Sequence, residues 1–339
     1  MSATRRRTVR RLAVATWCIV IALTLLIEGM TTGRAAPEPD RRAPAPTTPA
    51  VAAHPVAGCG TASIMRAGST TARSVRVGGV TRRYQVHVPS IYTGHIPVPL
   101  IIAYHGRAER AATFANYSGL SGLPAIVVYP LGLAGRKGQS AWQGAPYASP
   151  RADDVAFTRE ILRDLRTAAC VDRSRTFAVG RSNGGGFVAL LACRMPWEFA
   201  GFATVSAAVY ARSVARCQSG PAISLIDFHG TADRTISYQG GTRFGERYLS
   251  SASWLRRWTQ RAGCVDAPLT MPLTHSVDRL SWPLCGGLGS SVVHYRLRGG
   301  GHRWPAAVGG HGTGSVGGAM SATQLIWQFF LTRPALGSS

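Results

Sequence analysis

Short runs of apolar residues recur along the chain and alternate with segments in which apolar residues return every three or four positions. The short runs are rich in β-branched or aromatic residues, which is typical of buried strands. We expect strands at 84–89, 99–104, 125–129, 175–179, 202–206, 222–228 and 292–297. We expect helices at 153–169, 183–193, 250–261 and 320–331. This alternation predicts an α/β protein with a mostly parallel central sheet and helices on both faces.

The first 57 residues follow a different pattern. A cluster of arginines between residues 5 and 11 precedes an uncharged apolar stretch at 12–27, and Gly33-Arg34-Ala35 offers a small-x-small cleavage site. This order predicts a secretory signal peptide over 1–35, with an uncleaved N-terminal anchor as the alternative. Residues 36–57 are rich in Pro and Ala and predict a disordered linker. We therefore expect a single folded domain over 58–339 that is secreted or associated with the cell envelope.

The charge balance is strongly basic. The 339 residues include 38 Lys and Arg against 15 Asp and Glu, and Lys137 is the sole lysine. Such an excess fits an anionic partner. The arginines are scattered, however, and form no basic helix, which is typical of a GC-rich genome that encodes Arg in place of Lys. We expect no nucleic-acid partner, a monomer, and membrane contact only through a retained N-terminal segment.

Cysteine usage supports export. Cys18 lies in the apolar N-terminal stretch, and an even number of six follows it: Cys59, Cys170, Cys193, Cys217, Cys264 and Cys285. An even set in an exported chain indicates disulfides, although six cysteines allow about 15 pairings. We favour Cys193 with Cys217 and Cys264 with Cys285, because each pair closes a short excursion, which leaves Cys59 with Cys170. No C-x-x-C or H-x-x-x-H spacing supports the alternative of a zinc site, so we expect no metal.

A candidate nucleophile lies between an expected strand and an expected helix. The sequence Gly180-Arg181-Ser182-Asn183-Gly184 follows the apolar run RTFAV and precedes FVALLAC. A serine nucleophile needs a tight turn that only small neighbours permit, with its hydroxyl exposed at the edge of the sheet. The context of strand, turn and helix therefore predicts Ser182 as a nucleophile.

A serine hydroxyl needs a histidine base and a carboxylate that orients this base. Asp233 follows one expected strand, and His302 lies in a glycine-rich loop after the last expected strand. Asp227 and Asp266 are weaker candidates for the acid, the former because it lies within a strand. His311 lies farther from a strand end than His302. The order Ser182, Asp233, His302 is that of an α/β-hydrolase triad.

Two N–H donors are expected to face the oxyanion of an acyl-transfer intermediate. Asn183, directly after the nucleophile, supplies the first. The loop after the strand at 99–104 would supply the second, from the amide of Arg107 or else of Gly106. His105 precedes a glycine at a strand end and is expected to orient this loop rather than to act as a base.

Five motifs together resemble one known family. They are His105-Gly106, Trp142 followed by Asp153-Asp154-Val155-Ala156-Phe157, Gly180-x-Ser182-Asn183-Gly184-Gly185, His229-Gly230-Thr231-x-Asp233 and Gly301-His302-x-Trp304-Pro305. Over residues 82–305 the chain resembles the secreted poly(3-hydroxybutyrate) depolymerase and feruloyl esterase family of α/β-hydrolases. The resemblance implies a serine esterase without a cofactor that cleaves esters of hydroxyalkanoate polymers or oligomers, or feruloyl-type esters of polysaccharides, through Ser182, Asp233 and His302.

The substrate pocket departs from the family pattern. Arg107 follows the His-Gly pair where smaller residues are common, and the segment after Trp142 lacks the adjacent cysteines of many relatives. Trp142 and Trp304 either line the pocket for an ester substrate, which can be polymeric, or pack in the core. Two other functions remain open: a cell-envelope acyltransferase that uses the same triad, and a non-catalytic binding module on a hydrolase scaffold.

Overall fold

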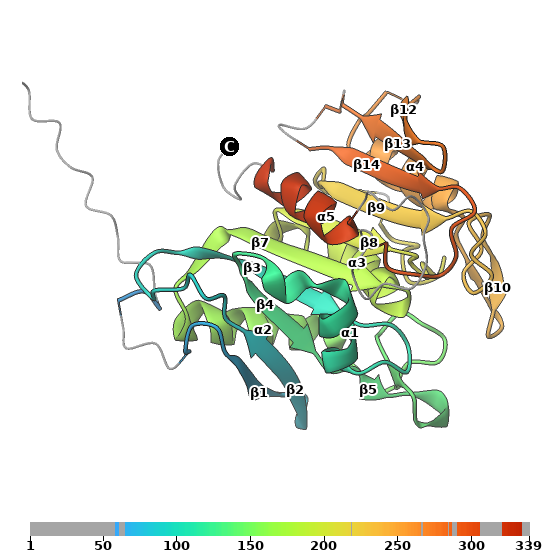
Figure 1. Cartoon of the computed structure of the whole chain (residues 1–339). Helices are drawn as coiled ribbons and strands as arrows, with labels where there is room; N and C mark the ends of the chain where they lie inside the picture. Colours follow the sequence, from blue (N-terminus) through green and yellow to red (C-terminus); the bar gives the residue numbers. More distant parts are fainter. Residues whose placement is uncertain are drawn as a thin grey trace, which may run out of the picture. The chain divides into compact units, whose positions relative to one another are not determined.

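The computed structural model describes residues 58–60, 65–217, 219–265, 267–283, 285–286, 290–305 and 321–333, all within one compact unit, His54–Ser339. The expected signal peptide (1–35) and linker (36–57) lie outside these residues. Ten strands of the described part form one sheet (Figure 1). In spatial order they are β1 (Thr70–Val77), β2 (Val80–His87), β4 (Ile126–Pro130), β3 (Val98–Tyr104), β7 (Val171–Arg181), β8 (Gly201–Val205), β9 (Leu225–Gly230), β14 (Val292–Leu297), β13 (Val277–Trp282) and β12 (Leu269–Thr274).

The middle of the sheet is parallel and its two edges are antiparallel. Strands β4, β3, β7, β8, β9 and β14 pair in parallel, whereas β1, β2, β12 and β13 pair antiparallel. Every residue of β3, β4, β8 and β9 is buried. Parallel strands are covered on both faces, so they are expected to be apolar throughout. The predicted fold class is confirmed.

Helices cover both faces of this sheet (Figure 1). They are α1 (Ala111–Ser118), α2 (Asp154–Ala168), α3 (Asn183–Arg194), α4 (Ser251–Arg261) and α5 (Ala322–Leu331), with single turns at Leu120–Gly122, Arg136–Gly138 and Pro196–Glu198. Alternate residues of β3 enter two cores: Leu100 and Ile102 belong to the core that includes residues of α2, α3 and α4, and Ile101 belongs to the core that includes residues of α1 and α5. The period of two along the strand thus divides one apolar run between two cores.

The seven expected strands and the four expected helices all occur, with shifted ends. The run at 222–228 is displaced, because the strand is Leu225–Gly230 and its last residues pair with Arg296 and Leu297 of β14. The expected helix at 153–169 begins one residue later, and the side chain of Asp153 caps it by accepting a hydrogen bond from the Ala156 amide.

Three disulfides connect the described cysteines, in the pairs that spacing favoured. Cys59 is joined to Cys170, Cys193 to Cys217, and Cys264 to Cys285. Two short hairpin-like pairs lie outside the sheet: β5 (Leu133–Ala134) with β6 (Ser140–Ala141), and β10 (Gly241–Arg243) with β11 (Glu246–Tyr248). No helix in the described part of the chain is long and apolar enough to cross a membrane.

Candidate active site

Ser182 lies alone between the end of β7 and the start of α3. Its backbone has φ 55° and ψ −118°, a conformation that costs an L-residue about 1–3 kcal/mol. Hydrogen bonds hold this strained turn, because the Ser182 amide donates to Val205 at 2.9 Å and its carbonyl accepts from Ala208 at 2.9 Å. A Cβ on Gly184 would come within 2.1 Å of the Tyr104 carbonyl oxygen. The glycine therefore lets the helix start close to the end of β3.

The structure brings the three expected triad residues together at the carboxyl ends of β7, β9 and β14. His302 Nε2 lies 2.9 Å from Ser182 Oγ, and His302 Nδ1 lies 2.7 Å from Asp233 Oδ2. A carboxylate only accepts, so the proton of the neutral imidazole is on Nδ1. Nε2 is then free to accept the Ser182 hydroxyl proton.

The Asp233 carboxylate is held by several donors. Its Oδ1 accepts the backbone N–H groups of Thr235 and Ile236, each at 2.8 Å. Burial alone would raise the pKa of Asp233, but hydrogen bonds from His229 and His302 outweigh burial and lower this pKa well below its usual range. The carboxylate therefore stays ionised at neutral pH.

His229 is a second histidine against the same carboxylate. Its Nε2 lies 2.8 Å from the Ile236 carbonyl oxygen and 3.3 Å from Asp233 Oδ2. Both partners accept, so this nitrogen carries a proton. Burial lowers the pKa of His229, but the hydrogen bond to Asp233 helps to raise it overall. Sequence reasoning quoted His229 only as a motif residue and missed this contact.

One of the two expected loop donors to the oxyanion is already occupied. The Gly106 amide donates to Glu109 Oε2 at 2.9 Å. The Arg107 amide has no acceptor among the described residues, and the Asn183 amide begins α3, where no intrahelical acceptor exists. The geometry therefore favours Asn183 and Arg107 as the donor pair and argues against Gly106.

An ion pair that the sequence did not predict links three loops of the site. The Arg181 guanidinium binds the Glu109 carboxylate and also donates from Nη2 to the His302 carbonyl oxygen at 2.8 Å. Glu109 in turn accepts from the Gly106 amide and from the Tyr117 hydroxyl, each at 2.9 Å. The nucleophile turn, the histidine loop and the oxyanion loop are thus fixed to one another.

The two tryptophans are core residues, and their expected role in the pocket is wrong. Trp142 has no exposed surface; its indole N–H donates to the His105 carbonyl at 2.8 Å, and its ring stacks on Phe187. Trp304 is 6% exposed and donates from its indole to Thr323 Oγ1 at 3.1 Å. Spacing along the chain could not distinguish a core indole from a pocket indole, because both lie just beside site motifs.

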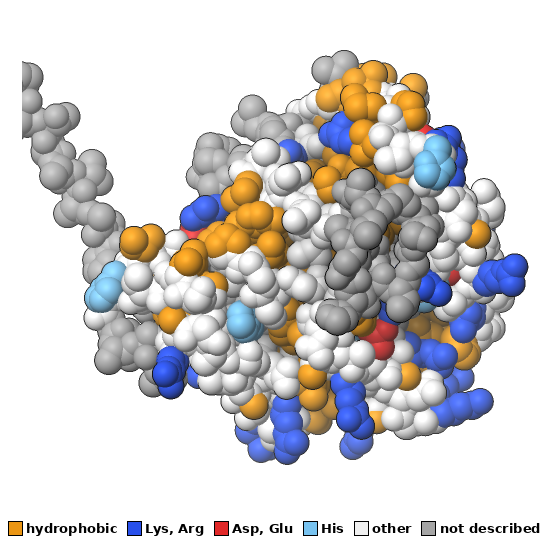
Figure 2. Space-filling view, in the orientation of Figure 1, with side chains coloured by type: hydrophobic (Ala, Val, Ile, Leu, Met, Phe, Trp, Pro, Cys, Tyr) orange, Lys and Arg blue, Asp and Glu red, His pale blue; other side chains and the backbone are white. Residues whose placement is uncertain are grey.

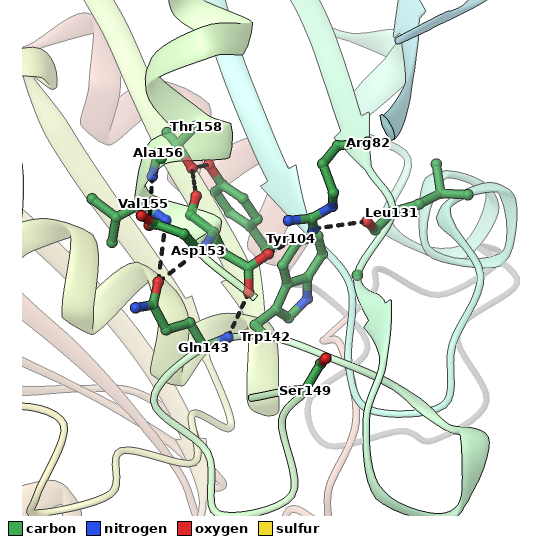
Figure 3. A network of polar contacts seen from close by, with 12 residues as sticks. Arg82, Tyr104, Leu131, Trp142, Gln143, Ser149, Asp153, Val155, Ala156 and Thr158 are labelled. Carbon is green, nitrogen blue, oxygen red and sulfur yellow. Dashed lines mark hydrogen bonds and ion pairs between the residues drawn. The ribbon is translucent and has the colours of Figure 1, made fainter. Parts of the chain in front are cut away.

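A buried polar network supports the loop that contains Trp142 (Figure 3). The Arg82 guanidinium lies 2.6 Å from Asp154 Oδ1, and Asp154 Oδ2 accepts the Gln143 amide at 2.6 Å. The Gln143 side chain accepts the Asp154 amide at 3.0 Å in return. The Trp142 amide donates to the Asn183 side chain at 2.9 Å. The motif acid Asp154 thus fixes a loop that contacts the start of α3.

Asp227, the weaker candidate for the triad acid, and His105, the histidine of the oxyanion loop, both bind groups outside the triad. Asp227 accepts from His294 Nδ1 at 2.8 Å and from the Thr204 hydroxyl at 2.5 Å, in a buried pair apart from His302. His105 is buried, with Nδ1 2.7 Å from the Gly106 carbonyl and Nε2 accepting the Gly132 amide at 3.1 Å. It orients the loop, as expected. Asp266 and His311 lie outside the described residues. No group of His, Cys, Asp and Glu among the described residues could hold a metal ion.

Known proteins with similar sequences include feruloyl esterases and a putative esterase. The chain is 29% identical to feruloyl esterase B of Piromyces equi over 65% of its own length and 42% of that protein, so it spans less than half of that relative. It is 28% identical to the putative esterase NocK of Nocardia uniformis subsp. tsuyamanensis, over 84% of this chain and 88% of that protein. No family model matches the chain.

A solved structure supports the fold. The acetyl xylan esterase from Aspergillus awamori superposes with a TM-score of 0.55 at 14% identity, covering 77% of this chain and 99% of that one. At this identity the likeness speaks for the fold alone. The chain has the α/β-hydrolase fold, and the expected similarity to feruloyl esterases is confirmed.

Proposed function

We propose that this α/β-hydrolase chain is a secreted serine esterase that hydrolyses carboxylic esters through Ser182, His302 and Asp233. The observation that carries the proposal is the unbroken line of hydrogen bonds from Asp233 Oδ2 through the His302 ring to Ser182 Oγ, at 2.7 and 2.9 Å. The strained turn at Ser182 and the esterase names of similar proteins support it. The disulfides support an oxidising, extracellular location.

The geometry gives each residue one role. His302 Nε2 accepts the proton of Ser182 as Oγ attacks the ester carbonyl, and Asp233 holds the proton on Nδ1. The amides of Asn183 and Arg107 stabilise the oxyanion. His302 then donates its proton to the departing alcohol, which leaves an acyl-enzyme at Ser182. A water molecule, deprotonated by the same histidine, hydrolyses this intermediate and restores the free serine.

The natural substrate is proposed to be an ester on a polysaccharide. Feruloyl esterase B is named for feruloyl esters and the acetyl xylan esterase for esters of a polysaccharide, and these names favour this class over a hydroxyalkanoate ester. The resemblance of the motifs keeps the hydroxyalkanoate oligomer as the second substrate to test.

A substrate panel tests the proposal. The purified protein and its Ser182→Ala variant are compared on p-nitrophenyl acetate, p-nitrophenyl butyrate, methyl ferulate and a 3-hydroxybutyrate oligomer, with product acids and transfer esters measured by chromatography. We expect the wild type alone to release free acid. Equal turnover by both proteins would contradict a role for Ser182. Formation of transfer esters in place of acid, with a sugar or glycerol as acceptor, would identify an acyltransferase instead.

A further inference from the structure

The tip of the β10–β11 hairpin holds an unusual aromatic residue. Arg243 pairs with Glu246, so the loop consists of Phe244 and Gly245, with φ 55° and 79°. Two-residue loops with both φ values positive strongly prefer Asn-Gly, and a phenylalanine there is strained. The ring is 47% exposed, so core burial does not account for it. A strained, exposed aromatic residue is more typical of a binding role than of a folding role.

Two guanidinium groups lie over this ring. The central carbon of Arg107 is 4.9 Å from the centre of the Phe244 ring, and that of Arg243 is 5.3 Å away. Tyr147 packs its ring at 4.8 Å from Phe244, edge to face, and Arg107 also lies 5.2 Å above Tyr147. Cation–π contacts of this kind hold arginines in place while leaving their N–H edges open. We call Arg107, Tyr147, Arg243 and Phe244 the cationic rim.

The cationic rim is attached to the two loops that flank the nucleophile. Arg107 belongs to the loop whose amide faces the expected oxyanion. Arg243 Nη1 donates to the Thr235 carbonyl at 2.6 Å, and the Thr235 amide donates to Asp233, so this arginine lies against the loop of the triad acid. The rim therefore joins the loop of the proposed oxyanion donor to the loop of the triad acid.

Neither arginine of the rim has a carboxylate partner among the described residues. Arg107 Nη1 donates to the neutral Gln139 side chain at 2.6 Å. Glu246 stands opposite Arg243 in the hairpin, but its carboxylate lies 3.6 Å from Arg212 and makes no ion pair with Arg243. Both arginines are half-buried, and their central guanidinium carbons lie 4.9 and 5.3 Å from one ring centre. Like charges so close to one ring repel each other, so an anion that contacts both would be bound favourably.

The surrounding surface has the same sign. Figure 2 shows basic side chains along the lower side of the molecule and around the β10 hairpin, with few acidic ones among them. A basic surface around the cationic rim would attract anionic substrates before contact, and salt would weaken this attraction.

We propose that the cationic rim binds a carboxylate of the substrate, so that the esters cleaved best carry an acidic group near the scissile bond. Acidic sugars fit this description, because their carboxylate can bind Arg107 and Arg243 beside the exposed part of Phe244. This inference rests on the proposed esterase function. It names the class of substrate that this site prefers.

Matched pairs of synthetic esters test the inference. One pair is p-nitrophenyl hydrogen glutarate and its methyl ester, which places the charge on the acyl side. The other is 4-acetoxybenzoate and its methyl ester, which places it on the alcohol side. We expect the wild type to favour the anionic member of at least one pair about tenfold in kcat/KM, because hydrogen bonds to a charged group are stronger than those to a neutral one. Sodium chloride should reduce this preference.

Variants separate the rim from general surface charge. Arg243→Gln should abolish most of the anionic preference, measured as a ratio within the same protein. Arg247→Gln removes the same charge from an exposed position on the same hairpin and should keep the ratio. A wild type that hydrolyses the neutral esters with no anionic preference, or an unchanged ratio in Arg243→Gln, would overturn the rim and leave the esterase intact.

A binding measurement covers the case in which no ester is cleaved. Calorimetric titration of the Ser182→Ala variant with 4-acetoxybenzoate should show binding. The double variant Ser182→Ala/Arg243→Gln should bind the same ester about tenfold more weakly. Equal binding by the two proteins, or none by either, would overturn the rim independently of catalysis.

Discussion

Replacing Asp233 by Asn should reduce kcat by about 10⁴, because the local hydrogen bonds dictate how the new amide must lie. The backbone N–H groups of Thr235 and Ile236 both donate to Oδ1, so the amide oxygen takes that place. The NH₂ group then takes the place of Oδ2, 2.7 Å from His302 Nδ1. His302 must accept this donor, which moves its own proton to Nε2, opposite Ser182. The base is lost, and the weaker contact of the same position with the His229 Nε2–H group, at 3.3 Å, is lost with it.

The loss corresponds to about 5.4 kcal/mol of transition-state stabilisation. Steady-state hydrolysis of p-nitrophenyl butyrate measures it, and circular dichroism confirms that the variant is folded. Asp227→Asn is the matched control, because Asp227 is a buried aspartate on β9, the strand that precedes Asp233, and it binds His294 instead of His302. We expect this control to keep kcat within about tenfold. A folded Asp233→Asn protein with a loss below about tenfold, or a greater loss in Asp227→Asn, would refute the assignment of the acid.

Three further predictions concern the links around the site and the stability of the domain. Glu109→Gln weakens the ion pair with Arg181 that connects three loops, so kcat should fall about tenfold with little change in KM. The control is Glu160→Gln, which weakens an exposed ion pair on α2 and should change neither value. The pKa of Asp164 is lowered, since hydrogen bonds from Arg73 and Tyr84 outweigh burial. The ionised carboxylate therefore contributes to stability above about pH 4, and this contribution is lost below it. Asp164→Asn should make the thermal unfolding midpoint fall less steeply between about pH 5 and 3. Replacing both cysteines of Cys59–Cys170, which are 111 residues apart, should lower the free energy of unfolding by about 5 kcal/mol, because this bond closes a long loop. Replacing Cys264 and Cys285, which are 21 residues apart, should lower it by about 3 kcal/mol. Equal losses in urea unfolding would contradict this dependence on loop length.

The centre of the fold could be predicted because its signals are local. Parallel strands buried on both faces are continuous apolar runs, and their carboxyl ends meet at one edge, which is why Ser182, Asp233 and His302 could be placed together from strand ends alone. The outer strand β12 could not be found in this way. Leu269, Met271 and Leu273 alternate along it, but all three are exposed. Pro272 interrupts the run, and a proline within a run argues against a strand.

The environment of the site depends on contacts between distant residues. Arg181 and Glu109 are 72 positions apart, and no periodicity connects them. Trp142 was expected in the pocket or the core, and only the packing of Phe187 and the His105 carbonyl against it places it in the core. The stacking of Arg107 on Phe244 likewise requires the hairpin to fold back over the oxyanion loop. It is therefore easier to predict from sequence which residues form the triad than to predict which residues surround the substrate.

Covalent labelling tests the central claim most directly. The purified protein is treated with a fluorophosphonate, which reacts with an activated serine, and is then digested and analysed by mass spectrometry. We predict a single adduct, on Ser182. Esterase activity should fall in proportion to the labelled fraction and be lost when labelling is complete. The His302→Ala variant should be labelled more slowly by orders of magnitude. An adduct on another residue, or full activity after Ser182 is labelled, would contradict the account.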